Sequence, residues 1–213
     1  MPHLWTQAVL FDLDGTLVDS TASVNRSWRH VAQLMGRDPA EIVGRYHGMP
    51  GSLVLEIVDP TLSRDRIQQL NEILLDLETN DTSGVTALPG AALAMAALPA
   101  ERWAIVTSCS RQLANARLTA ANLSIPNSMV TADDVTHGKP HPEPFLTGAG
   151  ILNRAPADCL VFEDAPAGVA AARAAGCEVL GVRTTHLELD AETVKDLSRV
   201  TFTCGSEGIS VSW

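Results

Sequence analysis

Two aspartates directly follow a short apolar run near the start of the chain. The run Ala8-Val9-Leu10 reads as a buried strand, and Phe11-Asp12-Leu13-Asp14-Gly15-Thr16 comes after it. Burying one unpaired carboxylate is costly, and burying two close together is costlier unless a positive charge lies between them. A hard divalent cation such as Mg²⁺ accepts carboxylate, carbonyl and water oxygens. The motif therefore indicates a metal-binding strand end, although a solvated turn explains Asp-x-Asp-Gly equally well when it is taken alone.

The composition limits the classes of protein that the chain can represent. It has 213 residues, 46% of them apolar, and a formal net charge of −10. These values fit an acidic globular protein with one domain and an insertion, or with two small domains. Because the sequence has no cluster of lysines and arginines, we expect no nucleic-acid partner. We also expect no membrane partner, because no apolar run approaches the ~18 residues that span a bilayer.

The amino-terminal residues and the cysteines bear on cellular location. The opening residues Met-Pro-His-Leu-Trp lack the basic and apolar regions of a signal peptide. Cysteines occur without Cys-x-x-Cys spacing and mostly inside apolar runs, at Cys109, Cys159, Cys177 and Cys204. We therefore expect reduced packing residues rather than disulfides or a zinc site, and a cytoplasmic protein.

The pattern of apolar residues changes along the chain. From about Ser20 to Thr82, apolar residues recur at steps of three and four, which predicts two amphipathic helices. The first carries Val24, Trp28, Val31 and Met35, and the second carries Ile67, Leu70, Leu74 and Leu77. From about Gly84 onward, short apolar strands alternate with alanine-rich helices.

The later part of the chain predicts a parallel sheet. The strand candidates are residues 103–107, 159–163 and 179–182, with a candidate edge strand at 200–203. The predicted helices are residues 91–98, 112–121, 143–151 and 167–175, and Gly176 stands where a left-handed helix stop is expected. Continuous apolar strands with helical crossovers indicate an α/β fold with helices on both faces of the sheet. Because the strand before Asp12 belongs to this sheet, we predict a core of residues 1–17 and 84–213 and an inserted helical domain at 18–83.

Polar residues lie at the carboxyl ends of the predicted strands. The first strand ends in Asp12 and Asp14, the next in Thr107-Ser108-Cys109-Ser110 and a later one in Glu163-Asp164, while Lys139 lies in an intervening loop. Taken singly, these residues fit a solvated lysine, helix caps and an acidic helix start. In parallel α/β sheets, however, ligands bind beyond the carboxyl ends of the strands. The whole set therefore predicts one crevice where acids, hydroxyls and a lysine meet.

This set of residues suggests phosphoryl transfer. Asp12 is the candidate nucleophile, which would attack phosphorus and form an aspartyl-phosphate. Mg²⁺ would bridge Asp12, the backbone carbonyl of Asp14, Asp164 and a phosphate oxygen, and would offset repulsion between the two anions. Asp14, brought back by the turn at Gly15, would protonate the leaving alcohol and then deprotonate the attacking water.

The remaining polar residues would bind the transferring phosphate or support the groups that do. Ser108 and the amides near Cys109 would donate hydrogen bonds to the phosphate, and Lys139 would add positive charge to the phosphate and to the nucleophile. Glu163 and Thr16 are the candidates for holding the catalytic and phosphate-binding side chains in position.

On these residues the chain resembles the haloacid dehalogenase superfamily of aspartate-nucleophile phosphohydrolases. Four motifs occur in order, namely Asp12-Leu13-Asp14-Gly15-Thr16, Ser108, Lys139 within Gly138-Lys139-Pro140, and Glu163-Asp164. The resemblance implies a Rossmann-like parallel sheet of strand order 5-4-1-2-3. It also implies that the helical segment at 18–83 is a C1-type cap that closes over the core.

Within the superfamily, four segments look like those of small sugar-phosphate and polyol-phosphate phosphatases, which include glycerol-3-phosphate and 2-deoxyglucose-6-phosphate phosphatases. The segments are residues 84–90, 103–108, 138–144 and 162–168. The likeness implies a Mg²⁺-dependent phosphatase acting on small sugar or polyol phosphates. Asp14 speaks against true dehalogenases, because displacing a halide needs no acid whereas expelling an alkoxide does.

The loop Tyr46-His47-Gly48-Met49-Pro50-Gly51 of the expected cap offers candidates for substrate binding. His47 and Gly48 would face the hydroxyls of the substrate, with a plain surface histidine as the alternative for His47. A phosphosugar mutase is an alternative function, but the loop lacks the arginine that β-phosphoglucomutase relatives carry, and a mutase must bind a second phosphate, so this absence argues against it. A non-catalytic phosphosugar-binding module is a second one. We expect a monomer or weak dimer whose partner is a small phosphate ester.

Overall fold

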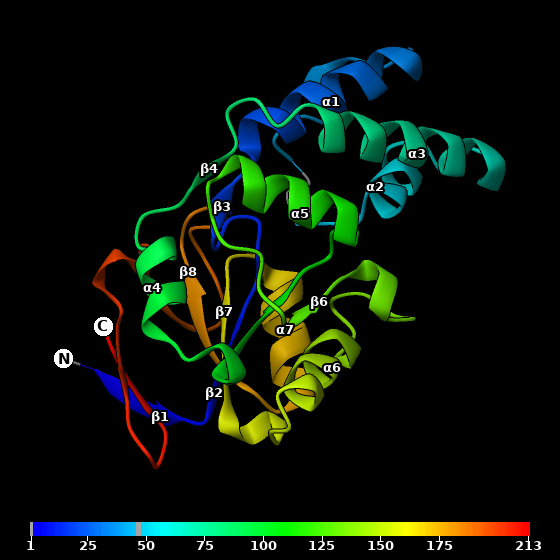
Figure 1. Cartoon of the computed structure of the whole chain (residues 1–213). Helices are drawn as coiled ribbons and strands as arrows, with labels where there is room; N and C mark the ends of the chain where they lie inside the picture. Colours follow the sequence, from blue (N-terminus) through cyan, green and yellow to red (C-terminus); the bar gives the residue numbers. More distant parts are fainter. Residues whose placement is uncertain (1, 46–47) are drawn as a thin grey trace.

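A six-stranded parallel sheet forms the centre of the protein. The computed structural model describes residues 2–45 and 48–213 (Figure 1). The strands lie in the order β6-β5-β2-β7-β8-β9, and every neighbouring pair is parallel. Their bounds are β2 Ala8–Phe11, β5 Trp103–Val106, β6 Met129–Val130, β7 Cys159–Glu163, β8 Glu178–Val182 and β9 Glu192–Val194. The α/β fold class is confirmed. The implied order 5-4-1-2-3 is confirmed as well, because it corresponds to β8-β7-β2-β5-β6. Strand β9 extends the sheet beside β8 and was not predicted.

The two faces of this sheet carry two separate apolar clusters. Val9 and Phe11 of β2 point to one face, and Ala8 and Leu10 point to the other, as the alternation of side chains along a strand requires. Helices α4 and α5 pack on the first face, and α6 and α7 on the second (Figure 1). Their bounds are α4 Ala91–Ala97, α5 Arg111–Ala120, α6 Glu143–Ile151 and α7 Pro166–Ala175. Because both faces are covered, the strands are apolar throughout, which made them recognisable in the sequence.

The ends of these helices follow local sequence signals. Ser110 precedes α5, and its side chain accepts a hydrogen bond from the Leu113 amide. Ser110 is therefore the N-cap of this helix, as the alternative explanation for the residues after the strand at 103–107 proposed. Gly176 ends α7 with φ +86°, the left-handed conformation expected of it. Short 3₁₀ turns occupy Pro39–Glu41, Ala100–Arg102, Ala132–Asp134, Pro156–Asp158 and Leu197–Arg199.

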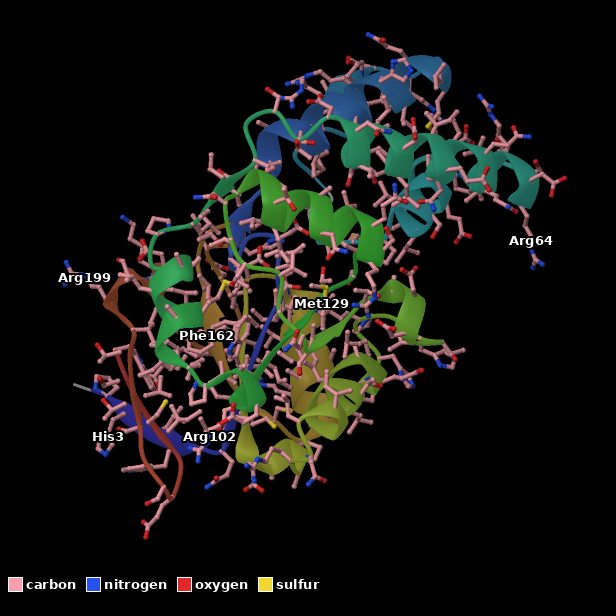
Figure 2. The ribbon with its side chains drawn as sticks, viewed as in Figure 1. His3, Arg64, Arg102, Met129, Phe162 and Arg199 are labelled. Carbon is pink, nitrogen blue, oxygen red and sulfur yellow. The ribbon has the colours of Figure 1, made fainter. Side chains whose placement is uncertain are left out.

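A small antiparallel sheet covers part of the face that α4 and α5 also cover. It has the order β1-β11-β10, with β1 His3–Thr6, β10 Thr201–Cys204 and β11 Ile209–Ser212. The amino and carboxyl termini therefore lie side by side (Figure 1). Phe202 of β10 packs edge-on against Phe162, whose side chain lies in the interior while His3 and Arg199 lie at the periphery (Figure 2). The edge strand expected at 200–203 corresponds to β10.

Three helices form a unit with a core of its own at one end of the molecule (Figure 1). They are α1 Thr21–Leu34, α2 Gly51–Val58 and α3 Arg64–Asn80, and we call residues 21–80 the helical unit. Trp28, Val54 and Leu70 are buried together in it. The chain enters and leaves through the antiparallel pair β3 Val18–Asp19 and β4 Thr86–Ala87. Two adjacent strands, β3 and β4, therefore connect the helical unit to the sheet-containing part.

No helix in the described parts of the chain has both the length and the hydropathy needed to cross a bilayer. The four cysteines are all free. Cys109, Cys159 and Cys177 are buried, as expected of packing residues, whereas Cys204 on the edge strand β10 is exposed.

Candidate active site

The carboxyl ends of three neighbouring strands meet in one cleft. Asp12 follows β2, Thr107 follows β5, and Glu163 and Asp164 end β7 and follow it. Lys139 reaches the same cleft from the loop before α6. The cleft has a volume of about 150 Å³ and is lined both by these residues and by residues of the helical unit. The structure thus brings Asp12, Lys139 and Asp164 together from three distant parts of the sequence.

Lys139 is the positive centre of this group. Its ammonium nitrogen Nζ lies 2.6 Å from Asp12 Oδ1 and 2.6 Å from Glu163 Oε1, and it donates a third hydrogen bond of 3.0 Å to the Val106 carbonyl. Burial disfavours the charged ammonium, but the carboxylates of Asp12 and Glu163 outweigh that effect and raise the pKa of Lys139. Lys139 is therefore a buried, charged side chain with a fixed position.

Glu163 is held in place by the start of α7. Its Oε2 accepts a hydrogen bond of 2.9 Å from the Ala165 amide, while its Oε1 accepts one from Lys139. A methyl group on Gly168 would lie 1.7 Å from Glu163 Oε1, so only glycine leaves room for this carboxylate. Glu163 and Asp12 therefore share the ammonium group of Lys139.

Negative charge exceeds positive charge in the group. Carboxylate oxygens of Asp12, Glu163 and Asp164 lie within 4.8 Å of one another. Burial, opposed by Lys139 and reinforced by Glu163, raises the pKa of Asp12 to about 7. Burial and the neighbouring Asp12 raise the pKa of Asp164 well above its usual value. Three carboxylates face one ammonium, and a divalent cation with a preference for oxygen ligands would balance the remaining charge.

The turn at Gly15 allows Asp164 to approach the first motif. Gly15 has φ +81°, which favours glycine, and a methyl group there would lie 1.9 Å from Asp164 Oδ2. Thr184 donates a hydrogen bond to the Gly15 carbonyl. Thr16, expected to support the site, is fully buried directly after this turn. Gly15 therefore allows the turn after Asp14 to pack closely against the Asp164 side chain.

Asp14 lies on the wall of the cleft and is bound by an arginine. Its Oδ2 accepts a hydrogen bond of 2.5 Å from Arg117 Nη1 and one of 3.0 Å from Cys109 Sγ. Arg117 Nη2 in turn donates a bond of 2.6 Å to Glu78 Oε2. Sequence reasoning missed both Arg117 and Glu78.

A signal for both residues exists in the sequence. Arg117 stands four and three residues after Leu113 and Ala114, on the buried face of α5. Glu78 stands four residues after Leu74, where it continues the apolar stripe of α3. A charged residue at a position that periodicity assigns to the core needs a partner when it is buried.

The phosphate-binding candidates after β5 differ in exposure. Ser108 is exposed and lines the cleft, whereas Cys109 is buried and its amide donates a hydrogen bond of 3.1 Å to Thr107 Oγ1. Burial raises the pKa of the Cys109 thiol well above its usual value. The expectation for Cys109 concerned its backbone, and the structure adds a side-chain contact to Asp14.

The helical unit reaches the cleft through Gly48 and its neighbours. Gly48 has φ +80°, and a methyl group there would lie 2.9 Å from the Ala165 side chain, so this loop approaches the start of α7 closely. Met49 and Asn71 also line the cleft. His47, the other candidate from this loop, lies outside the described residues.

Comparison with known proteins agrees with this arrangement. The family described as "Haloacid dehalogenase-like hydrolase" matches residues 9–182. The chain belongs to this family. It is 44% identical over 178 residues to hexitol phosphatase A of Escherichia coli, a match covering 81% of each protein. It is 33% identical over 193 residues to glycerol-1-phosphate phosphohydrolase 2 of Saccharomyces cerevisiae, covering 85% of this chain and 76% of that protein.

Solved structures agree with the family and the fold. The crystal structure of a hydrolase from Pseudomonas syringae superposes with a TM-score of 0.80 at 29% identity, covering 90% of this hydrolase and 94% of that chain. The resemblance inferred from the four motifs and the Rossmann-like fold are therefore confirmed. The expected enzyme class, a phosphoric monoester hydrolase, is confirmed by the family together with its phosphatase relatives.

Proposed function

We propose that this hydrolase releases phosphate from small sugar or polyol phosphates, with Asp12 as the nucleophile. The observation that carries the proposal is the 2.6 Å contact between Asp12 Oδ1 and Lys139 Nζ in a cleft that also contains Asp164. The relatives named for hexitol and glycerol-1-phosphate support the substrate class. The cleft volume of about 150 Å³ suits a small ester.

The reaction would proceed in two displacements at phosphorus. In the first, a carboxylate oxygen of Asp12 attacks, the bond from phosphorus to the substrate's ester oxygen breaks, and Asp14 gives its proton to the departing alkoxide. In the second, water attacks the aspartyl-phosphate and passes a proton to Asp14, while the bond from phosphorus to Asp12 breaks. Both side chains return to their starting states.

Lys139 and the residues after β5 would stabilise the transferring group. Lys139 favours the ionised form of Asp12 and orients its carboxylate, and its charge also attracts the phosphate. Ser108 would donate a hydrogen bond to the phosphate oxygens, and the Cys109 amide would do the same in place of its bond to Thr107 Oγ1. Glu163 holds Lys139 in place, so its role is to position the lysine.

The acidic group fits a divalent cation, and we propose Mg²⁺. The carboxylates of Asp12 and Asp164 and the backbone carbonyl of Asp14 would hold it, because hard oxygen ligands match this ion. When bound, Mg²⁺ supplies positive charge that offsets repulsion between the carboxylate nucleophile and the phosphate. The excess of carboxylates over ammonium groups in the cleft supports this assignment.

The helical unit, within the segment 18–83, would serve as a cap that excludes water and selects the substrate. The close approach of Gly48 to Ala165 supports a role for this loop in closure. His47 and Gly48 remain the candidates for contacting substrate hydroxyls. We also propose a monomer or weak dimer in the cytoplasm, where free cysteines such as the four in this chain persist.

A substrate panel tests the proposal. Release of inorganic phosphate is measured from hexitol, glycerol and hexose phosphates, with Mg²⁺ and with EDTA, for the wild type, Asp12→Asn and the exposed control Asp65→Asn. We expect Mg²⁺-dependent release by the wild type and the control, and loss of activity in Asp12→Asn. Equal activity in Asp12→Asn would reject Asp12 as nucleophile. An isomerised phosphosugar in place of phosphate would indicate the mutase, and Mg²⁺-dependent binding without turnover would indicate the binding module.

A further inference from the structure

A buried arginine joins the catalytic candidate Asp14 to the helical unit. The side chain of Arg117 is only 4% exposed, and that of Glu78 is 9% exposed. Arg117 donates to Asp14 Oδ2 at 2.5 Å through Nη1 and to Glu78 Oε2 at 2.6 Å through Nη2. Helix α5, which carries Arg117, packs against α3, which carries Glu78 (Figure 1). One guanidinium thus spans the boundary between the sheet-containing part and the helical unit.

The contacts fix one oxygen of Asp14 and leave the other without a hydrogen-bond partner among the described residues. Oδ2 receives hydrogen bonds from both Arg117 and the Cys109 thiol, whose Sγ also lies 2.9 Å from Arg117 Nη1. Asp14 Oδ1 has no protein partner among the described residues, although it is buried and its side chain lines the cleft. Because a guanidinium is planar and rigid, it determines the direction of a carboxylate better than a flexible ammonium does. Oδ1 is therefore the oxygen left to face a reacting group.

We propose that Arg117 is the positioning residue that aims Asp14 Oδ1 at the leaving-group oxygen, and that Glu78 secures Arg117 from the helical unit. The inference rests on the proposed function and extends it to residues that lie outside the four motifs. Arg117 is almost fully buried in the wall of the cleft, and the role assigned to it is exerted through Asp14.

The role predicts a specific dependence on the leaving group. An alkyl phosphate, such as a hexitol phosphate, expels an alkoxide and needs the proton from Asp14. An aryl phosphate, such as p-nitrophenyl phosphate, expels a stable phenolate and does not. Since kcat/KM reports the steps up to departure of the alcohol, misaiming of Asp14 lowers kcat/KM for the alkyl ester alone. Hydrolysis of the aspartyl-phosphate also uses Asp14, so a misaimed variant shows a burst of phenolate followed by slow turnover.

The experiment compares the two esters in four variants. For Arg117→Gln we expect kcat/KM for the alkyl phosphate to fall roughly 100-fold, the lower end of general acid contributions, and kcat/KM for the aryl phosphate to change less than about 3-fold. Arg117→Lys restores part of the loss, because it returns the charge without the planar geometry. Glu78→Gln gives a smaller loss in the same direction, about 10-fold. Arg111→Gln is the matched control on the same helix, an exposed arginine paired with Asp134, and leaves both values unchanged.

Each outcome decides the inference. An equal loss for both esters in Arg117→Gln, or no loss for either, overturns the positioning role while leaving the phosphatase function intact. If kcat/KM for the alkyl phosphate is unchanged in Glu78→Gln, the proposal that Glu78 secures Arg117 from the helical unit is overturned. Should Arg117→Gln fail to fold, the comparison of the two esters is made in Arg117→Lys, where an equal loss for both esters again overturns the positioning role. A wild type that releases phosphate from neither ester rejects the proposed function itself, which distinguishes the two failures.

Discussion

Lys139 Nζ and Asp12 Oδ1 lie 2.6 Å apart, although 127 positions separate the two residues in the sequence. The lysine also pairs with Glu163 at the same distance, so a single ammonium serves two buried carboxylates. Removing the charge from this position would leave both carboxylates without their partner. We therefore expect changes at Lys139 to affect both catalysis and stability.

Replacement of this lysine should affect both properties. For Lys139→Met we expect kcat to fall on the order of 10²- to 10³-fold, because a preorganised positive group is lost. We expect the free energy of unfolding in EDTA to fall by about 3–5 kcal/mol, the usual cost of breaking a buried ion pair. Lys195→Met removes an exposed lysine and should change stability by less than about 0.5 kcal/mol. Urea unfolding and phosphate release measure both quantities, and an unchanged kcat would contradict the role of Lys139.

Removal of the carboxylate at Asp164 should abolish the response to the metal. At Mg²⁺ concentrations near 100 times Kd, binding stabilises the folded wild type by about 2.7 kcal/mol. For a protein of this size that corresponds to a rise in Tm of roughly 5–10 °C. In Asp164→Asn we expect no such rise, measured by thermal unfolding with Mg²⁺ and with EDTA. An equal shift in both proteins would place the metal elsewhere.

The same carboxylates predict a pH dependence in EDTA. Burial raises the pKa of Asp12 from 3.8 to about 7 and raises that of Asp164 as well. Between pH 3.8 and about 7, the folded state holds more protons on Asp12 than the unfolded state does, so the free energy of unfolding decreases as pH rises. Asp164→Asn should flatten this decrease and exceed the wild type in Tm at pH 7. A wild-type stability in EDTA that increases from pH 4 to pH 7 would contradict the assignment of these shifts.

Alanine at Gly15 should damage the acidic group specifically. The new methyl would lie 1.9 Å from Asp164 Oδ2 and would also occupy a backbone with φ +81°. Gly36→Ala is a matched control, since Gly36 has φ +68° and open space around it. Both variants should lose about 1–2 kcal/mol from left-handed backbone strain. Only Gly15→Ala should also lose the rise in Tm on adding Mg²⁺, and retention of that rise would contradict the proposed packing.

Alanine at Gly168 should displace Glu163. The methyl would lie 1.7 Å from Glu163 Oε1, so the carboxylate would have to leave Lys139. We expect lower stability and lower kcat, with phosphate release and thermal unfolding as the measurements. Gly150→Ala, at an exposed helical position with open space, should instead stabilise the protein by up to about 1 kcal/mol. Wild-type activity in Gly168→Ala would show that Glu163 is not needed to orient Lys139.

Much of the fold follows from local patterns in the sequence. The predicted α6 has the observed bounds, and the predicted β7 matches as well, because long apolar runs with clear helix starts and stops are local signals. The strands β6 and β9 escaped prediction because they are only two and three residues long. β1 and β11 pair across nearly the whole length of the chain, so their partners cannot be inferred from neighbouring residues. Helix α2 was missed as well, being short and mostly apolar.

The candidate site likewise contains some residues that the sequence predicted and others that it did not. Asp12, Asp164 and Lys139 could be selected because strand ends and a family resemblance point to them. Glu163 was selected as a supporting residue too, but its bond to Lys139 was not predicted, because that bond depends on the room left by Gly168. Sequence reasoning also expected Asp14 to swing back over the leaving group through the turn at Gly15. In the structure Asp14 is held by Arg117, a partner 103 positions away.

Local patterns along the chain were enough to predict the parallel sheet, the helices inserted after strand β2, and the order in which the acids and the lysine appear. These properties depend on apolar periodicity and on residue types within a few positions of one another. The tertiary structure alone decided which charges pair, because a buried ion pair forms only where packing brings two side chains within hydrogen-bond distance. Lys139 with Glu163, and Arg117 with Asp14 and Glu78, are the pairs that this packing created.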